Sequence, residues 1–350
     1  MSGEVTAPPR GGKGTLAGPL SAVLAVAAVV LLGFIVHARS DGQVETLDAA
    51  QSRPLVRAPY ATEHTVKLPG IEVSVRVAEP LGSIDGALVR DRDHPDAESW
   101  VAPDDGRLVP VSWRARSTGA DPGPIDIYLA AGGERVSLDT IRFDGSTTAA
   151  TRLTSAVVAF ADDLDLADIT AEVEYDGLTQ TLHPATGEIE AGVAQALYEP
   201  LPELESNCAG SKRGCPVAAA DEDSALQIDG SVESRVRFQA YDSELGWAEK
   251  GTLWAEVDVS LESGDHVEDA AGNYFVIWDS PPMTVTLDGA RPSRSQGFDH
   301  PDLLTVHGVA VFPVAVDTPP QELRLRYTLN LSGEPGQLAV SATMPLASAE

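Results

Sequence analysis

The sequence predicts an all-β fold, in which two tandem antiparallel β-sandwiches follow an N-terminal transmembrane helix. Three observations lead to this prediction: apolar residues at alternate positions, an order of strand patterns that occurs twice, and one long uncharged run near the N-terminus. Alternation at every second residue is typical of strands that bury one face and expose the other to water. Clusters of Gly, Pro, Asn and Asp between the short strand patterns favour a sandwich.

The N-terminal run from Gly14 to Val36 has no charged residue and is long enough to cross a hydrocarbon core of about 30 Å as a helix. We therefore expect a cytoplasmic tail over residues 1–13, a signal anchor over 14–37 and an extended stalk over 38–64. The bulk of this single-pass cell-membrane protein would then be extracytoplasmic. The alternative is a cleaved signal peptide, because the sequence VHA, which ends at Ala38, resembles a cleavage site.

The first sandwich is predicted over residues 65–185 and the second over residues 225–347. Three strand patterns of the first half have counterparts in the second half, in the same order and with glycine turns between them. The predicted inward faces are Val109, Val111, Trp113 and Ala115 matched by Ala255, Val257, Val259 and Leu261, and Ile125, Ile127 and Leu129 matched by Met283, Val285 and Leu287. In the third pair, Phe160 to Tyr175 aligns with Phe312 to Tyr327 without a gap. The shared order predicts a duplicated all-β domain, in which Trp100 and Trp247 hold equivalent places in the sandwich core or at its end.

Residues 186–224 are predicted to connect the two sandwiches through a short helix and an acidic linker with a cysteine loop. Ile189, Val193, Ala196 and Leu197 have helical spacing, and Pro200 follows them. The rest of the segment, from Glu199 to Ser224, is rich in prolines and acidic residues, which is typical of a linker.

The two cysteines of the chain, Cys208 and Cys215, are expected to form a structural disulfide if this part lies in an oxidising compartment. A redox-active pair usually has the tighter Cys-x-x-Cys spacing, and two sulfurs alone make a poor zinc site. The disulfide would close a short loop within the linker.

The strand patterns resemble a known domain family. The sequence APDDGRLVPVSWRARSTG, followed by a glycine turn and AVVAFADDLDLADITAEVEY, is similar to the telokin-like, immunoglobulin-fold domains of membrane-anchored bacterial envelope proteins. The run GVAVFPVAVDTPPQELRLRY resembles the closing strand pair of that family more closely. The resemblance implies two immunoglobulin-like sandwiches with an extracytoplasmic role in binding or assembly, and it supplies no catalytic residues. The inter-sheet disulfide of many immunoglobulin domains is missing, because neither predicted sandwich contains a cysteine.

The charge balance excludes nucleic acid as a partner. The chain has 53 acidic residues against 24 basic residues, a formal net charge of -29, and a field of this sign repels phosphates. Solubility explains such acidity, and attraction of cations or basic partners is the alternative.

Calcium is a weak candidate ligand for the acidic run ADDLDLAD, which contains Asp162, Asp163, Asp165 and Asp168. Calcium needs six to eight converging oxygens, and the run lacks the EF-hand order, so a solvated loop is the simpler interpretation. The tetrapeptide DHPD occurs twice and offers His94 and His300 as metal ligands, but Asp and Pro in turns explain both copies.

The sequence contains no G-x-S-x-G elbow, H-E-x-x-H pair, P-loop or dinucleotide fingerprint, so we expect neither an enzyme nor a bound cofactor. Trp254 points away from the face that bears Ala255 and Val257, which makes it the interaction candidate, with burial under a loop or between domains as the alternative. The expected function is an envelope module that is anchored in the membrane by its N-terminal helix and binds a partner protein. The alternatives are a sensory ectodomain that binds a small ligand or Ca²⁺ and, less favoured, an envelope enzyme.

Overall fold

The structure is a computed structural model of the chain, and it describes residues 44–89, 99–117, 123–143, 150–208, 214–221, 224–279, 282–298, 305–334 and 336–349. The predicted cytoplasmic tail and signal anchor lie outside these residues. Within the described ranges, no helix is long and apolar enough to cross a membrane.

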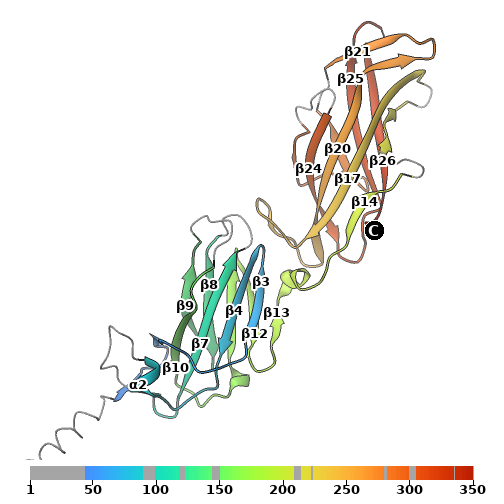
Figure 1. The fold of residues 1–350 in the computed structure, drawn as a ribbon. Coiled ribbons are helices and arrows are strands. Elements are labelled where there is room, and N and C mark those ends of the chain that lie inside the picture. The colour runs from blue at the N-terminus through green and yellow to red at the C-terminus, as the bar shows by residue number, and fades with distance from the viewer. Residues whose placement is uncertain are drawn as a thin grey trace, which may run out of the picture.

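The all-β prediction is confirmed: the described chain forms sheets in two β bodies that lie end to end (Figure 1), and the strand pairs are antiparallel except for the parallel pair of residues 44–46 with residues 99–101. The first body ends near residue 200 and the second begins at residue 203. The helical turns of the described residues are short and lie in the first body: α2 (Gly86–Val89) and two 3-10 helices, η1 (Leu166–Asp168) and η2 (Gly192–Leu197).

The first body is built around two five-stranded sheets. One sheet has the order β2 (Ser52–Pro54), β10 (Thr154–Phe160), β7 (Arg107–Ser117), β4 (Ile71–Val77) and β3 (His64–Leu68). The other has the order β13 (Glu188–Glu190), β12 (Leu178–His183), β11 (Thr170–Tyr175), β8 (Ile125–Ala131) and β9 (Glu134–Ile141). The core between them contains every residue of the predicted inward face, from Val109 to Ala115 at alternate positions and from Ile125 to Leu129 at alternate positions. The alternation therefore predicted these strand faces correctly.

A third, smaller layer covers the outer face of the β7 sheet, and it corrects the predicted stalk. Its strands are β1 (Val44–Thr46), β6 (Ser99–Val101) and β5 (Ser83–Ile84). Leu47 and Trp100 bury their side chains against Leu108 of β7 and Val157 of β10. Residues 44–64, expected as an extended stalk, are therefore part of the first body, because apolar side chains on both faces of β7 and β10 need a cover.

The second body has two layers that hydrogen bonds join at both edges. Its longest strands are β17 (Leu226–Gln239), β20 (Thr252–Asp269), β24 (Thr305–Ala315), β25 (Glu322–Leu331) and β26 (Gln337–Ser348). The shorter ones are β14 (Glu203–Ser206), β15 (Cys215–Pro216), β16 (Ala218–Ala219), β21 (Tyr274–Asp279), β22 (Thr284–Leu287) and β23 (Arg294–Gln296). β14 pairs with both β17 and β26, while β21 pairs with both β20 and β25. Because β17 also pairs with β20 and β25 with β26, the strand pairings form a closed ring.

The same antiparallel pairings occur in both bodies. The order β4–β7–β10 corresponds to β17–β20–β24, and the order β8–β11–β12 corresponds to β22–β25–β26. Phe160 on β10 and Phe312 on β24 are 1% and 0% exposed, and each lies in the main core of its own body. The predicted inward residues of the second half, from Ala255 to Leu261 and from Met283 to Leu287, are also buried.

The predicted linker over residues 186–224 is largely folded. The expected helix is only partly present: Val193, Ala196 and Leu197 lie in the 3-10 helix η2, whereas Ile189 lies in strand β13. Tyr198, which follows η2, donates a hydrogen bond to Gln180 Oε1 (2.8 Å) and accepts one from the Lys67 N–H (2.9 Å). Residues 203–219 contribute β14, β15 and β16 to the second body, because Leu204, Cys215 and Val217 are buried in its core. The long linker is therefore wrong.

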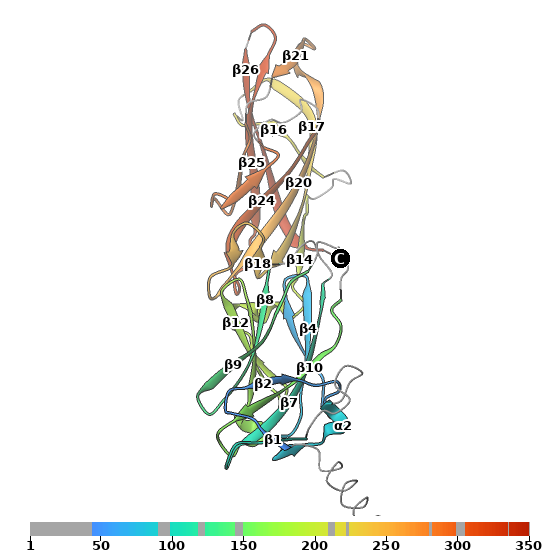
Figure 2. The same ribbon diagram turned by 90° about the vertical axis from the view of Figure 1, so that its left-hand side faces the viewer.

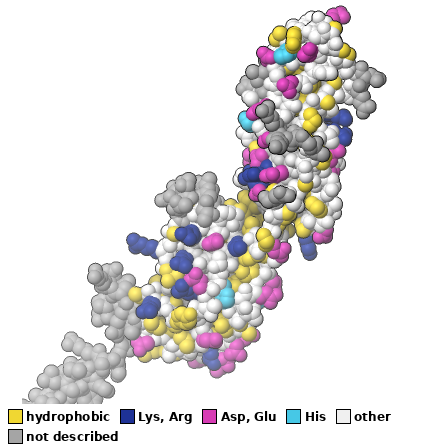
Figure 3. Space-filling view, turned by 45° about the vertical axis from the view of Figure 1, so that its right-hand side comes forward, with side chains coloured by type: hydrophobic (Ala, Val, Ile, Leu, Met, Phe, Trp, Pro, Cys, Tyr) yellow, Lys and Arg dark blue, Asp and Glu magenta, His cyan; other side chains and the backbone are white. Residues whose placement is uncertain are grey.

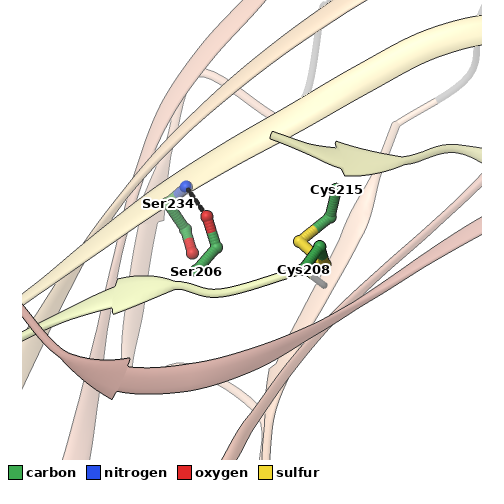
Figure 4. The surroundings of a disulfide bond; sticks show 4 residues. All are labelled: Ser206, Cys208, Cys215 and Ser234. Carbon is green, nitrogen blue, oxygen red and sulfur yellow. Dashed lines mark hydrogen bonds between the residues drawn. A yellow bond between two sulfur atoms is a disulfide. The ribbon is translucent and has the colours of Figure 1, made fainter. Parts of the chain in front are cut away.

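The predicted disulfide between Cys208 and Cys215 is confirmed. It joins the chain after β14 to β15, beside the hydrogen bond that the Ser234 N–H donates to Ser206 Oγ at 3.0 Å (Figure 4). Cys215 is fully buried in the core of the second body. The disulfide therefore links the chain after β14 and the strand β15 to this core.

A hairpin of the second body, β18 (Tyr241–Asp242) and β19 (Gly246–Trp247), contacts the first body. The indole N–H of Trp247 donates a hydrogen bond to the carbonyl oxygen of Tyr175 (3.1 Å), and the Tyr241 and Trp247 rings pack on Tyr175 with centroid distances of 5.6 and 6.3 Å. Trp100 and Trp247 thus have different roles: one lies in the third layer and the other joins the bodies. Their predicted equivalence is wrong.

Candidate interaction surface

β21 lies at the end of the second body that is farther from the first body (Figure 1), and it carries a row of exposed apolar side chains. Tyr274, Val276 and Trp278 are 64%, 57% and 62% exposed, whereas the alternate residues Phe275 and Ile277 face the core. The sequence YFVIWD places apolar residues on both faces of the strand, and only the face with Phe275 and Ile277 packs on the core. We call the three exposed residues the β21 stripe.

The β21 stripe is held by an ordered turn between β20 and β21. Asp269 Oδ1 accepts hydrogen bonds from the backbone N–H groups of Ala271 and Asn273, both at 2.9 Å, and Asp269 Oδ2 accepts one from Asn273 Nδ2 at 2.8 Å. Aspartate commonly fixes turns in this way. The stripe is therefore presented by a defined hairpin.

The β21 stripe is a concentration of exposed apolar surface. Among the described residues, eight large hydrophobic side chains are exposed, and three of them follow one another on this one strand face. Since Tyr and Trp side chains each have roughly 150–250 Å² of surface, the stripe exposes about 300–400 Å². Exposed apolar patches of this size in monomeric proteins are often functional.

The surroundings of the β21 stripe are acidic. Glu268 lies opposite Tyr274 across the β20–β21 pair, Asp265 precedes His266, and Asp279 follows Trp278. The hydrogen bond from His266 lowers the pKa of Asp265, and the Asn273 side chain lowers the pKa of Asp269, so both carboxylates are ionised at neutral pH. In Figure 3, hydrophobic and acidic side chains lie together at this end of the second body.

Lysine and arginine are missing from the strand segments around the stripe, and His266, which pairs with Asp265, is the basic residue in β20. Residues 251–290, which include β20 and β21, contain no Lys or Arg, and neither do residues 327–350. The first half of β17, residues 226–234, also has none. The stripe therefore combines an apolar centre with an acidic rim.

The predicted interaction candidate Trp254 is not on this surface. Its side chain is half-buried, and its indole N–H donates a hydrogen bond to the carbonyl oxygen of Gly246 at 2.9 Å, which fixes the β18–β19 hairpin. Trp278 takes its place as the exposed tryptophan. The sequence signal for an exposed Trp278 is the apolar run YFVIWD beside a glycine turn. The sequence does not show which face of such a strand is covered by the rest of the chain.

The four weak calcium candidates lie in the connection between β10 and β11, and two of them have other partners. Asp163 forms an ion pair with Arg107, and Asp168 Oδ2 accepts a hydrogen bond from the Asp165 N–H at 2.9 Å, while Asp162 is exposed. The described parts of the chain contain no group of three or more His, Cys, Asp or Glu side chains that could hold a metal ion. His94 and His300 lie outside the described residues.

A polar groove of about 870 Å³ crosses β14, β17, β20, β24 and β23 of the second body. Its carboxylates are largely paired: Glu205 with Arg235 at 3.0 Å, and Asp258 with Arg237 at 2.8 Å. Ser260 and His307 are cross-strand neighbours in the groove, but no hydrogen bond joins them in the described structure. The groove offers polar side chains to a ligand without assembling a nucleophile and its base.

No protein-family model, curated protein or solved structure matches the chain.

Proposed function

We propose that the protein is a membrane-anchored, extracytoplasmic interaction module of the bacterial envelope, in which two immunoglobulin-like sandwiches present a binding surface for a partner protein. The module is non-enzymatic, and it binds through the β21 stripe. The observation that carries this proposal is the alternating exposure of Tyr274, Val276 and Trp278 on one ordered strand.

Three further features support the proposal. The hairpin lies at the end of the second body that is farthest from the first body, where a partner can reach it (Figure 2). Aromatic side chains, Trp and Tyr above all, are enriched among the residues that dominate binding energy at protein interfaces. The disulfide between Cys208 and Cys215 is consistent with an oxidising compartment outside the cytoplasm.

In-cell crosslinking tests the proposal. The full chain, its Trp278→Ser variant and a Val316→Ser variant are each crosslinked in the producing bacterium, purified and analysed by mass spectrometry. Val316 is a matched control, because it is 53% exposed and directly follows β24, whose last residue, Ala315, pairs with Thr252 at the end of β20 opposite to β21. A partner recovered with the wild type and with Val316→Ser, but lost with Trp278→Ser, supports the proposal. Equal recovery with all three chains contradicts it.

The second candidate is a ligand-binding sensory ectodomain, and the polar groove favours it. A ligand held there would contact Ser260, His307 and the Glu205–Arg235 pair. Its signature is a rise in the melting temperature with a small polar ligand that His307→Ala abolishes and Trp278→Ser leaves intact.

A further inference from the structure

The charge around the β21 stripe restricts which partners can bind it. Glu268 and His266 lie opposite Tyr274 and Val276 across the β20–β21 pair, and His266 Nδ1 is 2.7 Å from Asp265 Oδ1. Asp279 follows Trp278 in the sequence, and the neighbouring strand segments contain no Lys or Arg. A partner that covers the stripe must desolvate these carboxylates or pair them, and unpaired buried charges are costly. The partner must therefore bring positive charge to the rim.

A second copy of this chain does not meet that requirement. In a symmetric dimer the stripe would face itself, and the acidic rims of two chains, each with a formal net charge of -29, would approach one another. Like charges that face each other across an interface are costly, so the acidic rim disfavours a symmetric dimer through this surface. Anionic lipid surfaces and nucleic acids are disfavoured for the same reason.

The geometry of the stripe indicates the form of the partner. Successive side chains on one face of a strand are about 6.6–6.8 Å apart, so the stripe matches an extended segment with apolar residues at alternate positions. The exposed faces of Trp278 and Tyr274 also attract Lys and Arg side chains through cation–π contacts. The Tyr274 ring already contacts the His266 ring, with a centroid distance of 4.7 Å, which holds it in place.

We infer that the β21 stripe binds an extended segment of a partner protein that carries Lys or Arg together with apolar side chains. This inference rests on the proposed function. The apolar side chains of the segment pack on Val276 and the two aromatic rings, while its cations pair with the carboxylates of the rim. Both parts of the surface are needed, because neither the apolar stripe nor the acidic rim alone selects such a segment.

Binding of synthetic peptides to the full chain, held in nanodiscs of neutral phosphatidylcholine, tests the inference. The probe is an acetylated peptide in which Val and Arg alternate, compared with Val–Glu and Ser–Arg peptides of equal length. We expect the Val–Arg peptide to bind at least about tenfold more tightly than both, and Trp278→Ser to weaken it roughly 30-fold. Glu268→Gln should weaken it several-fold and reduce its salt dependence.

Two controls separate the stripe from general attraction to an acidic protein. Glu233→Gln removes an exposed carboxylate of the second body away from β21, and Val316→Ser removes an exposed valine at its other end. Both variants should bind the Val–Arg peptide as the wild type does. The inference is overturned if the Val–Glu peptide binds equally well, or if Trp278→Ser and Glu268→Gln have no greater effect than these controls. A cellular partner that depends on Trp278 but not on Glu268 or on salt would overturn this inference and leave the proposed function intact.

Discussion

Asp242 and Arg294 form an ion pair that supports the hairpin joining the two bodies, and its removal gives a sharp test of the structural account. The Asp242 side chain is 2% exposed, and its Oδ2 accepts a hydrogen bond from Arg294 Nη2 at 2.7 Å. Oδ1 accepts hydrogen bonds from the backbone N–H groups of Glu244 (2.9 Å) and Leu245 (3.0 Å). The perturbation is Asp242→Asn, which keeps the shape and removes the charge.

The expected loss in the free energy of unfolding of the second body is about 3 kcal/mol. Breaking a buried pair by removing one partner typically costs 3–5 kcal/mol, because the other charge is left buried. Arg294 is 18% exposed and keeps a second acceptor, Glu244, at 3.4 Å, which places the loss at the lower end of that range. A double-mutant cycle with Arg294→Ala should give a coupling energy of about 1–3 kcal/mol.

The stability lost by Asp242→Asn should depend on pH. Burial alone would raise the pKa of Asp242, but hydrogen bonds from the Glu244 and Leu245 N–H groups and from Arg294 outweigh it and lower the pKa. A carboxyl group whose pKa is lower in the folded protein stabilises the fold at pH values above its pKa in the unfolded chain, which is near 3.9. This stabilisation is lost as the pH falls through the pKa of the folded protein. The difference between wild type and Asp242→Asn should therefore shrink below about pH 4.

Urea denaturation followed by tryptophan fluorescence and circular dichroism measures both quantities. The Phe160→Ala and Phe312→Ala variants identify which transition belongs to which body. A difference of less than about 0.5 kcal/mol at pH 7, the usual size of a surface effect, would refute the assignment of a buried, stabilising pair.

Three further predictions follow from the cores, the disulfide and the junction. Phe160→Ala and Phe312→Ala should each destabilise their own body by about 3–5 kcal/mol in the same denaturation assay, and a change within error would contradict their place in the two cores. Cys208→Ser should lower the stability of the second body by about 2.5 kcal/mol, since a loop of this length gives that chain-entropy effect, and the first body should melt unchanged. Trp247→Ala should remove the ring contacts with Tyr175 and broaden the distribution of end-to-end distances in small-angle scattering; an unchanged distribution would argue against that contact.

The sequence predicted the strand faces well, because a buried face leaves a period of two that tertiary contacts do not disturb. Val109, Trp113, Val257 and Leu261 lie where that period puts them. The two phenylalanines matched between the halves also lie at corresponding strands of the two main cores.

The third layer and the folded linker were missed for different reasons. The third layer depends on contacts of Leu47 and Leu55 with an outer sheet face, and a three-residue strand such as β1 is too short for its period to be recognised. The strands of the predicted linker, β14 to β16, have two to four residues, and proline and acidic neighbours hid them.

The binding surface was only partly accessible from the sequence. Trp254 was the predicted interaction candidate, but Trp254 and Trp278 both lie on strands and differ in what covers them. The hydrogen bond to Gly246 fixes the first, and nothing described in the structure covers the second. Parts of the chain that are distant in sequence decide which side chains are exposed, so the exposed tryptophan could be identified only from the three-dimensional structure.

Site-specific photo-crosslinking in intact cells tests directly whether the β21 stripe is the binding surface. A photoreactive amino acid replaces Val276 in one full-length chain and Val316 in another, and both adducts are identified by mass spectrometry. We expect a protein adduct from position 276 that is missing from position 316 and is lost when Trp278→Ser is added. Identical adducts from the two positions, or none from position 276, would contradict the claim that the β21 stripe is the binding surface.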